Sequence, residues 1–174
     1  GPEVSFETET SINRPIISGE GEKKWLEYLE ITCKGQVPSE EVLNRWKTYG
    51  VDLPDLSPGY IEEDYEQLNN RIVYFETSRG CPYLCSFCLS ALDKTVRYFD
   101  DKVIHKQIDG LVKANVKKFK FVDRTFNLKP SRMQDLMKWL SQFNGCEFHF
   151  EVVGDILTPS ILKFLNTVPP GMFQ

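Results

Sequence analysis

The sequence contains no long apolar run, since nowhere do about 18 consecutive apolar residues occur, the length that a membrane-spanning helix needs. It also has no basic segment followed by a small-residue cleavage site, the pattern of a secretory signal. An excess of positive charge is missing as well, because 25 acidic residues outnumber 21 basic ones. These absences predict a soluble, cytoplasmic protein that binds neither membranes nor nucleic acid.

The cysteines do not suit a disulfide framework, because their number is odd, five, and no secretory signal accompanies them. Three of them, Cys81, Cys85 and Cys88, fall within eight residues, and no fourth cysteine or histidine lies nearby in the sequence. Zinc sites usually have four ligands. Three thiolates on one loop suit a 4Fe-4S cluster with one open iron, since all-protein clusters use four cysteines. Structural zinc and a purely structural cluster remain alternatives.

The first 71 residues differ in pattern from the rest. Residues 1–35 combine a Glu/Thr/Ser-rich stretch with a helix that residues 19–22 are expected to open. The apolar face of this helix would hold Trp25, Leu26, Leu29 and Cys33. Residues 36–71 are rich in proline and glycine and read as a linker with short helices near 39–49 and 61–69. Cys33 and Cys146 are both expected to be buried, as free cysteines usually are.

Strands and helices alternate from residue 72 onward. Strands are predicted at 72–77, 119–122 and 148–153, and residues 171–174 read as the beginning of a fourth strand. Helices are predicted at 100–116, after a cap at Ser131, and at 159–166 after the Thr158-Pro159 pair.

Strand–helix units of this kind predict a parallel sheet with right-handed crossovers, hence the α/β class. A closed eightfold barrel needs ~250 residues, and only about 100 follow the linker. The prediction is therefore a partial β/α barrel or a small open sheet, and the cut-off last strand favours the partial barrel. Unpaired strand edges would make such a fragment self-associate.

The cysteine loop has x3-x2 spacing, carries Phe87 directly before the third cysteine and follows the first strand. In these features it resembles the cluster motif of the radical S-adenosylmethionine (SAM) superfamily. The resemblance implies that Cys81, Cys85 and Cys88 hold a 4Fe-4S cluster whose open iron binds SAM. An external electron donor would reduce the cluster, and cleavage of SAM to a 5'-deoxyadenosyl radical would abstract hydrogen from a small-molecule substrate. Phe87 would lie against the adenine, or alternatively pack within the loop.

The end of the second strand is where this family offers polar groups to the SAM amine, often as Gly-Gly-Glu. Here Asp123-Arg124-Thr125 occupies that place, so the position matches and the letters do not. The resemblance implies that Asp123 accepts from the ammonium while Thr125 or the backbone assists, which makes 123–125 a cofactor-binding segment. The alternative is an Asp123 that caps a loop. Glu151, after the third strand, is a candidate for the ribose or substrate side.

A narrower resemblance concerns the N-terminal part. Residues 1–5 and 16–22 resemble the end of a Rossmann-like cobalamin-binding domain, and 123–127 resembles members of the cobalamin-containing branch with unassigned substrates. This implies three parts: a domain remnant over 1–35, a linker over 36–71 and the first half of a barrel over 72–174. The Asp-x-His-x-x-Gly segment that ligates cobalt in many such domains is absent. Cobalamin is therefore expected in the parent protein and not on this fragment.

The function implied is that of a radical SAM enzyme, of which this chain would be an inactive fragment with unknown catalytic residues. The alternative is a zinc- or cluster-binding interaction module without SAM chemistry.

Overall fold

The structure is a computed structural model that describes residues 15–47, 59–88 and 94–174. The chain divides into two compact units, residues 1–55 and 56–174. Residues 1–14 of the predicted remnant and residues 48–58 of the predicted linker lie outside the described residues. The assignment of 1–35, 36–71 and 72–174 as separate parts stays a prediction.

The first unit is organised around Trp46. Its helices are α2 (Glu22–Cys33) and α3 (Glu40–Lys47). The fully buried Trp46 donates from Nε1 to Glu27 Oε2 at 2.7 Å, and Arg45 also pairs with Glu27. Lys24 Nζ donates to the carbonyl of Ser18 at 2.7 Å. These bonds tie α2 to α3 and to the segment before α2.

The apolar face expected on α2 is not buried. Trp25, Leu26 and Leu29 are exposed, and α2 contributes no buried residue. The prediction that Cys33 is buried is wrong, because this residue at the end of α2 is exposed. Periodic spacing produced the helix, but no described element packs against that face.

The second unit is built on an open parallel sheet. Strands β1 (Ile72–Phe75), β4 (Lys118–Phe121) and β5 (Glu147–His149) lie in the order β1-β4-β5, and both pairings are parallel. Phe173 pairs with Phe148 in the parallel sense, which confirms the predicted start of a fourth strand. The α/β class is confirmed, and the sheet is open and not a closed barrel.

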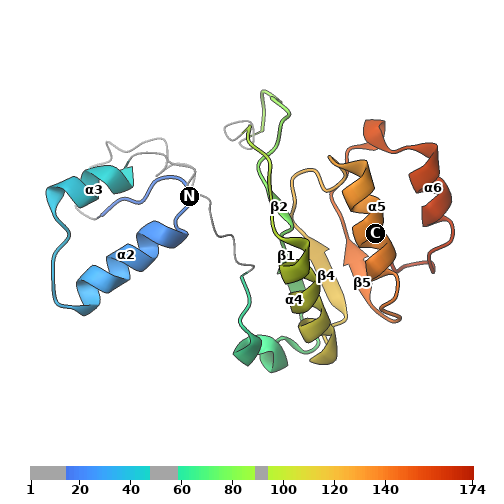
Figure 1. The fold of residues 1–174 in the computed structure, drawn as a ribbon, viewed down its shortest axis with the longest axis horizontal. Coiled ribbons are helices and arrows are strands. Elements are labelled where there is room, and N and C mark those ends of the chain that lie inside the picture. Colours follow the sequence, from blue (N-terminus) through green and yellow to red (C-terminus); the bar gives the residue numbers. More distant parts are fainter. Residues whose placement is uncertain (1–14, 48–58, 89–93) are drawn as a thin grey trace. The chain divides into compact units, whose positions relative to one another are not determined.

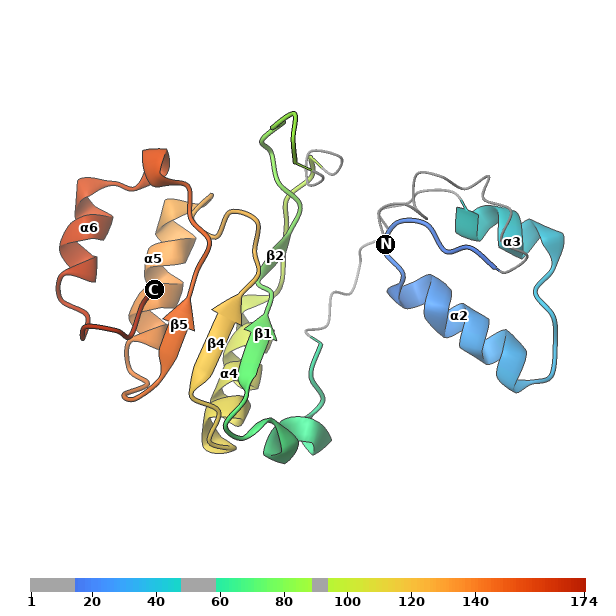
Figure 2. The ribbon, with the colours of Figure 1, turned by 180° about the vertical axis from the view of Figure 1, so that it is seen from behind.

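Helices α4 (Asp101–Lys113) and α5 (Pro130–Leu140) cover one face of this sheet, as Figure 1 and the view from behind in Figure 2 show. Helix α6 (Pro159–Leu165) follows β5, and two short 3-10 helices, η1 (Glu62–Leu68) and η3 (Gly154–Ile156), complete the unit. Helix η1 packs on α4. None of the helices among the described residues is long and apolar enough to cross a membrane.

The helix starts test the predicted caps. Thr158 caps α6 as predicted, since its hydroxyl accepts from the Ile161 amide at 3.3 Å. The cap predicted at Ser131 is wrong: α5 begins at Pro130, with Lys129 at the cap position. Proline suits the first helical position because its φ is fixed near the helical value and it lacks an N–H.

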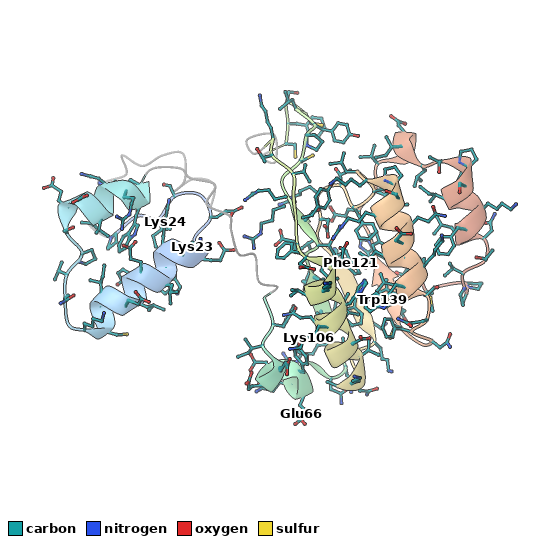
Figure 3. All side chains as sticks on the ribbon, viewed as in Figure 1. Lys23, Lys24, Glu66, Lys106, Phe121 and Trp139 are labelled. Atoms are coloured by element: carbon teal, nitrogen blue, oxygen red, sulfur yellow. The ribbon has the colours of Figure 1, made fainter. Side chains whose placement is uncertain are left out.

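The core lies between the sheet and its helices and is dominated by phenylalanine. Alternation along each strand sends one set of side chains towards the helices. Phe121, labelled in Figure 3, is fully buried. Its ring centroid lies 5.8 Å from that of Phe75 and 4.8 Å from that of Phe150. Cys146 is buried as predicted. On the opposite face, Ile72 and Tyr74 are each 56% exposed.

Candidate functional site

The cysteine loop leaves the carboxyl end of β1 and projects beyond the sheet (Figure 1). Its base is closed by two short strands that the sequence did not predict, β2 (Ser78–Arg79) and β3 (Arg97–Tyr98), which pair antiparallel. The amide of Phe99 also donates to the Thr77 carbonyl at 3.0 Å. The loop therefore departs from, and returns to, one fixed point at the end of the first strand.

The three cysteines of this loop differ in exposure. Cys81 is buried, whereas Cys85 and Cys88 are exposed. The Cys88 amide donates to the Cys85 carbonyl at 3.0 Å, so these two residues share one turn. Within the described ranges, no group of three His, Cys, Asp or Glu side chains is placed to hold a metal ion. The donor set, three thiols on one loop, fits a cluster by its chemistry.

Phe87 lies on the same turn and is 91% exposed. A ring this exposed buries almost no apolar surface. In this structure the Phe87 ring therefore does not pack within the loop, as the alternative interpretation required. Its contact with an adenine stays a prediction.

Asp123, directly after β4, is almost completely buried at 1% exposure. Its Oδ1 accepts from Thr77 Oγ1 at 2.7 Å and from Ser78 Oγ at 2.6 Å, and the Thr77 amide donates to both carboxylate oxygens at 3.1 and 3.2 Å. Burial raises the pKa of this carboxyl, and the hydrogen bonds from Ser78 and Thr77 and the nearby Arg132 act in the opposite direction. The carboxylate thus faces the chain's own strand end.

The other two residues of the 123–125 segment differ in their exposure to solvent. Arg124 is exposed, whereas Thr125 is buried and its Oγ1 lies 3.7 Å from Cys81 Sγ. Glu151 is exposed after β5, and its carbonyl accepts from the Phe126 amide at 3.0 Å. The structure therefore brings Asp123 and Thr125 to the root of the cysteine loop and leaves the side chains of Arg124 and Glu151 at the surface.

Several polar residues near this root were not singled out from the sequence. Arg132 of α5 donates to Asp101 at 2.6 Å and to Thr77 Oγ1 at 3.3 Å, and its guanidinium lies over the Tyr98 ring at 4.9 Å. Asn127 is fully buried and bonds both the carbonyl and the amide of Val153. The signal for Asn127 was its place in the polar run after the second strand; nothing in the sequence placed Arg132 beside Thr77.

Comparisons with known proteins supply the family context. The chain matches no protein-family model. It is 36% identical over 62 residues to the cobalamin-dependent radical SAM methyltransferase TokK of Streptomyces tokunonensis. The structure of the chain is also similar to that of the radical SAM methyltransferase TsrM from Kitasatospora setae, with a TM-score of 0.56 and 15% sequence identity. The chain resembles the cobalamin-containing radical SAM proteins.

The match covers only part of each of these proteins. The matched segment is 34% of this chain and 9% of TokK. The structural match covers 86% of this chain and 34% of the TsrM chain. The TsrM structure has tryptophan and the SAM analogue aza-SAM bound. The chain therefore spans about a third of the length of the TsrM chain that it matches.

Proposed function

We propose that this chain is the part of a cobalamin-dependent radical SAM methyltransferase that holds the 4Fe-4S cluster and SAM. The observation that carries the proposal is the trio of Cys81, Cys85 and Cys88 on a loop at the carboxyl end of β1 in an open parallel sheet. Functional groups of β/α barrels collect at that end of the strands. The names of the two similar proteins support methyl transfer as the reaction class.

The chemistry belongs to the bound groups: a reduced cluster with SAM supplies a 5'-deoxyadenosyl radical for hydrogen abstraction. The chain's share is to bind and to orient. Cys81 is the donor fixed by burial, and Cys85 and Cys88 are donors on an accessible turn. The exposed Phe87 on that turn would cover the adenine of SAM, and the exposed Arg124 and Glu151 would contact the polar part of SAM or the substrate.

Cobalamin is assigned to the parent protein. Neither of the two histidines of this chain lies in an Asp-x-His-x-x-Gly segment that could ligate cobalt. His105 stacks on Trp139 with ring centroids 4.0 Å apart, and His149 lies in β5. The partners proposed are a small-molecule methyl acceptor and an external electron donor.

Self-association is proposed from the edge of the sheet. β1 is an edge strand, and its Ile72 and Tyr74 side chains are exposed on the face that carries no described helix. Open edges with apolar side chains favour pairing with another copy. Light scattering after size exclusion is expected to give a dimer or larger species, and a monodisperse monomer of 20.2 kDa would contradict this.

The function is tested by anaerobic reconstitution of the full 174-residue chain with iron and sulfide, followed by EPR of the dithionite-reduced protein with and without SAM. We expect iron and acid-labile sulfide in equal amounts and a signal that changes when SAM is added. Cys85→Ser should abolish the signal. Cys33→Ser, at an equally exposed cysteine outside the loop, should leave it intact.

Two other outcomes would contradict the proposal. Tight zinc binding without iron uptake would support the alternative of an interaction module. A cluster signal indifferent to SAM would instead identify a module that only transfers electrons.

A further inference from the structure

The first cysteine of the loop is attached to the sheet in a way that the other two are not. Cys81 is 8% exposed, and its Sγ lies 3.7 Å from the Oγ1 of Thr125, which is 6% exposed. Cys85 and Cys88 are exposed. Because the Thr125 hydroxyl is buried, it has little access to water as a hydrogen-bond partner. The Cys81 sulfur is the partner that the structure places beside it.

A second attachment lies two residues earlier on the same segment. Asp123 accepts hydrogen bonds from the Thr77 amide and hydroxyl and from the Ser78 hydroxyl, all from the strand end that leads into the loop. Residues 123 and 125 point inwards, and Arg124 between them points to solvent. Residues 123–125 therefore contact the chain both before and after Gly80, at residues 77–78 and at Cys81. Gly80 has a φ of +89° and turns the backbone into the loop.

Building on the proposed function, we infer that Asp123 and Thr125 are positioning residues for the first cluster ligand. When Cys81 binds iron as a thiolate, its sulfur carries no hydrogen, so the Thr125 hydroxyl is the donor of this contact. Asp123 fixes the strand end from which the loop departs. This role differs from recognition of the SAM amine. An external ammonium would have to displace the Thr77 and Ser78 donors from a carboxylate that is 1% exposed.

The chemical consequence follows from the character of a thiolate ligand. A hydrogen bond to the sulfur withdraws electron density from it and favours the more negative, reduced form of a cluster, so it raises the reduction potential. Partners that orient a ligand also slow the loss of metal, and their removal typically lowers metal affinity about 10-fold or more. Thr125 should therefore affect both the potential and the retention of iron.

The test compares Thr125→Val, which keeps the shape and removes the hydroxyl, with Thr125→Ser, which keeps the hydroxyl. Both are made in the full chain and reconstituted anaerobically. We expect Thr125→Val to lose iron to a chelator about 10-fold faster and to shift the midpoint potential to more negative values. Thr125→Ser should keep both values of the unmodified chain.

Thr167→Val serves as the matched control, because Thr167 is an exposed residue after α6 whose hydroxyl donates to the Phe164 carbonyl at 2.6 Å. It should change neither readout. Thr125→Ala removes the same hydroxyl without adding bulk, and it replaces the valine variant if circular dichroism shows that the latter does not fold.

The outcomes separate this inference from the function on which it rests. Unmodified chain that takes up no iron overturns both. Unmodified chain that loads a SAM-responsive cluster, with Thr125→Val or Thr125→Ala matching it in iron loss and potential, overturns only the positioning role. An equal loss of iron in Thr125→Ser and Thr125→Val also overturns it, because the effect would then follow from packing and not from the hydroxyl.

Discussion

Helices α2 and α4 are of nearly equal length, with 12 and 13 residues, yet they differ in how many of their side chains are buried. Helix α4 buries four side chains against the sheet and η1, whereas α2 buries none among the described residues. Both sequences carry apolar residues at helical spacing. The difference teaches that periodicity produces a helix, but only a partner surface turns an apolar stripe into a core.

The two units also shift the pKa of a hydrogen-bonded carboxyl group in opposite directions. Glu27, in the first unit, accepts from Trp46 and Arg45, and these hydrogen bonds hold its pKa below the ordinary value. Asp123, in the second unit, has its pKa raised by burial. An exposed carboxylate gains from each donor, whereas a deeply buried one must first lose its hydration.

The largest effect is expected from truncating the core face of α4. Ile108 is fully buried, so Ile108→Ala should lower the free energy of unfolding by about 2–5 kcal/mol through lost burial and the cavity left behind. Urea denaturation followed by circular dichroism measures it. A loss below about 1 kcal/mol would mean that the face of α4 is less well packed than described.

A smaller effect, of opposite sign in the two units, is expected from pH. The raised pKa of Asp123 means that the folded chain binds its proton more tightly than the unfolded chain. Its contribution to stability is therefore present below the ordinary carboxyl pKa and is lost as pH rises through the folded pKa, with a slope of at most about 1.4 kcal/mol per pH unit. Asp123→Asn should remove this component from urea melts taken across the acid range.

Glu27 provides the contrast. Because its pKa is lowered, its contribution is present above the ordinary carboxyl pKa and is lost as pH falls through the folded pKa. Glu27→Gln should flatten that acid-side loss in urea melts followed by tryptophan fluorescence. The same direction of change in both variants would contradict the comparison.

A glycine on α4 gives the next effect. A Cβ added at Gly110 would lie 2.5 Å from Cε2 of the buried Tyr65 ring, so Gly110→Ala must displace η1 from the helix. Overpacking outweighs the gain in helix propensity, and we expect a net loss of about 1 kcal/mol in thermal or urea unfolding. Gly154→Ala is the control, since nothing lies within 4 Å of its added Cβ. A Gly110→Ala variant as stable as this control would show that the Tyr65 ring and η1 can move away from α4 at no cost in stability.

The smallest effect is expected on α2. Leu26 is 58% exposed, so Leu26→Ala should change the free energy of unfolding by less than about 0.5 kcal/mol. The same urea titration as for Ile108→Ala gives the direct comparison. A loss of several kcal/mol would show that this face of α2 is covered in solution.

Much of the second unit was predictable because its signals are local. The strands predicted at 72–77 and 119–122 and the helix predicted at 100–116 correspond to β1, β4 and α4, whose observed bounds are 72–75, 118–121 and 101–113. Parallel pairing followed from the alternation of strands and helices. Thr158 was predictable as a cap for the same reason, because its partner, the Ile161 amide, is three residues away.

The cap at Ser131 was wrong for a local reason, because Pro130 already takes the first helical position. The other predictions that were wrong or absent depended on partners far along the chain. Cys33 is exposed because no described element packs against the apolar stripe of α2, and the β2–β3 pair joins residues that are 18 and 20 positions apart. Arg132 reaches Thr77 across 55 positions. Periodicity carries no information about such distances.

The sequence by itself determined the chemistry: three thiols at x3-x2 spacing after a strand, and a polar run after the next one. Only the tertiary structure decided what that polar run contacts. Parallel pairing of β1 with β4 sets their carboxyl ends side by side, which places Asp123 against Thr77 and Thr125 against Cys81 across more than 40 positions of chain. Residue types fix which bonds can form, and strand register fixes which of them do.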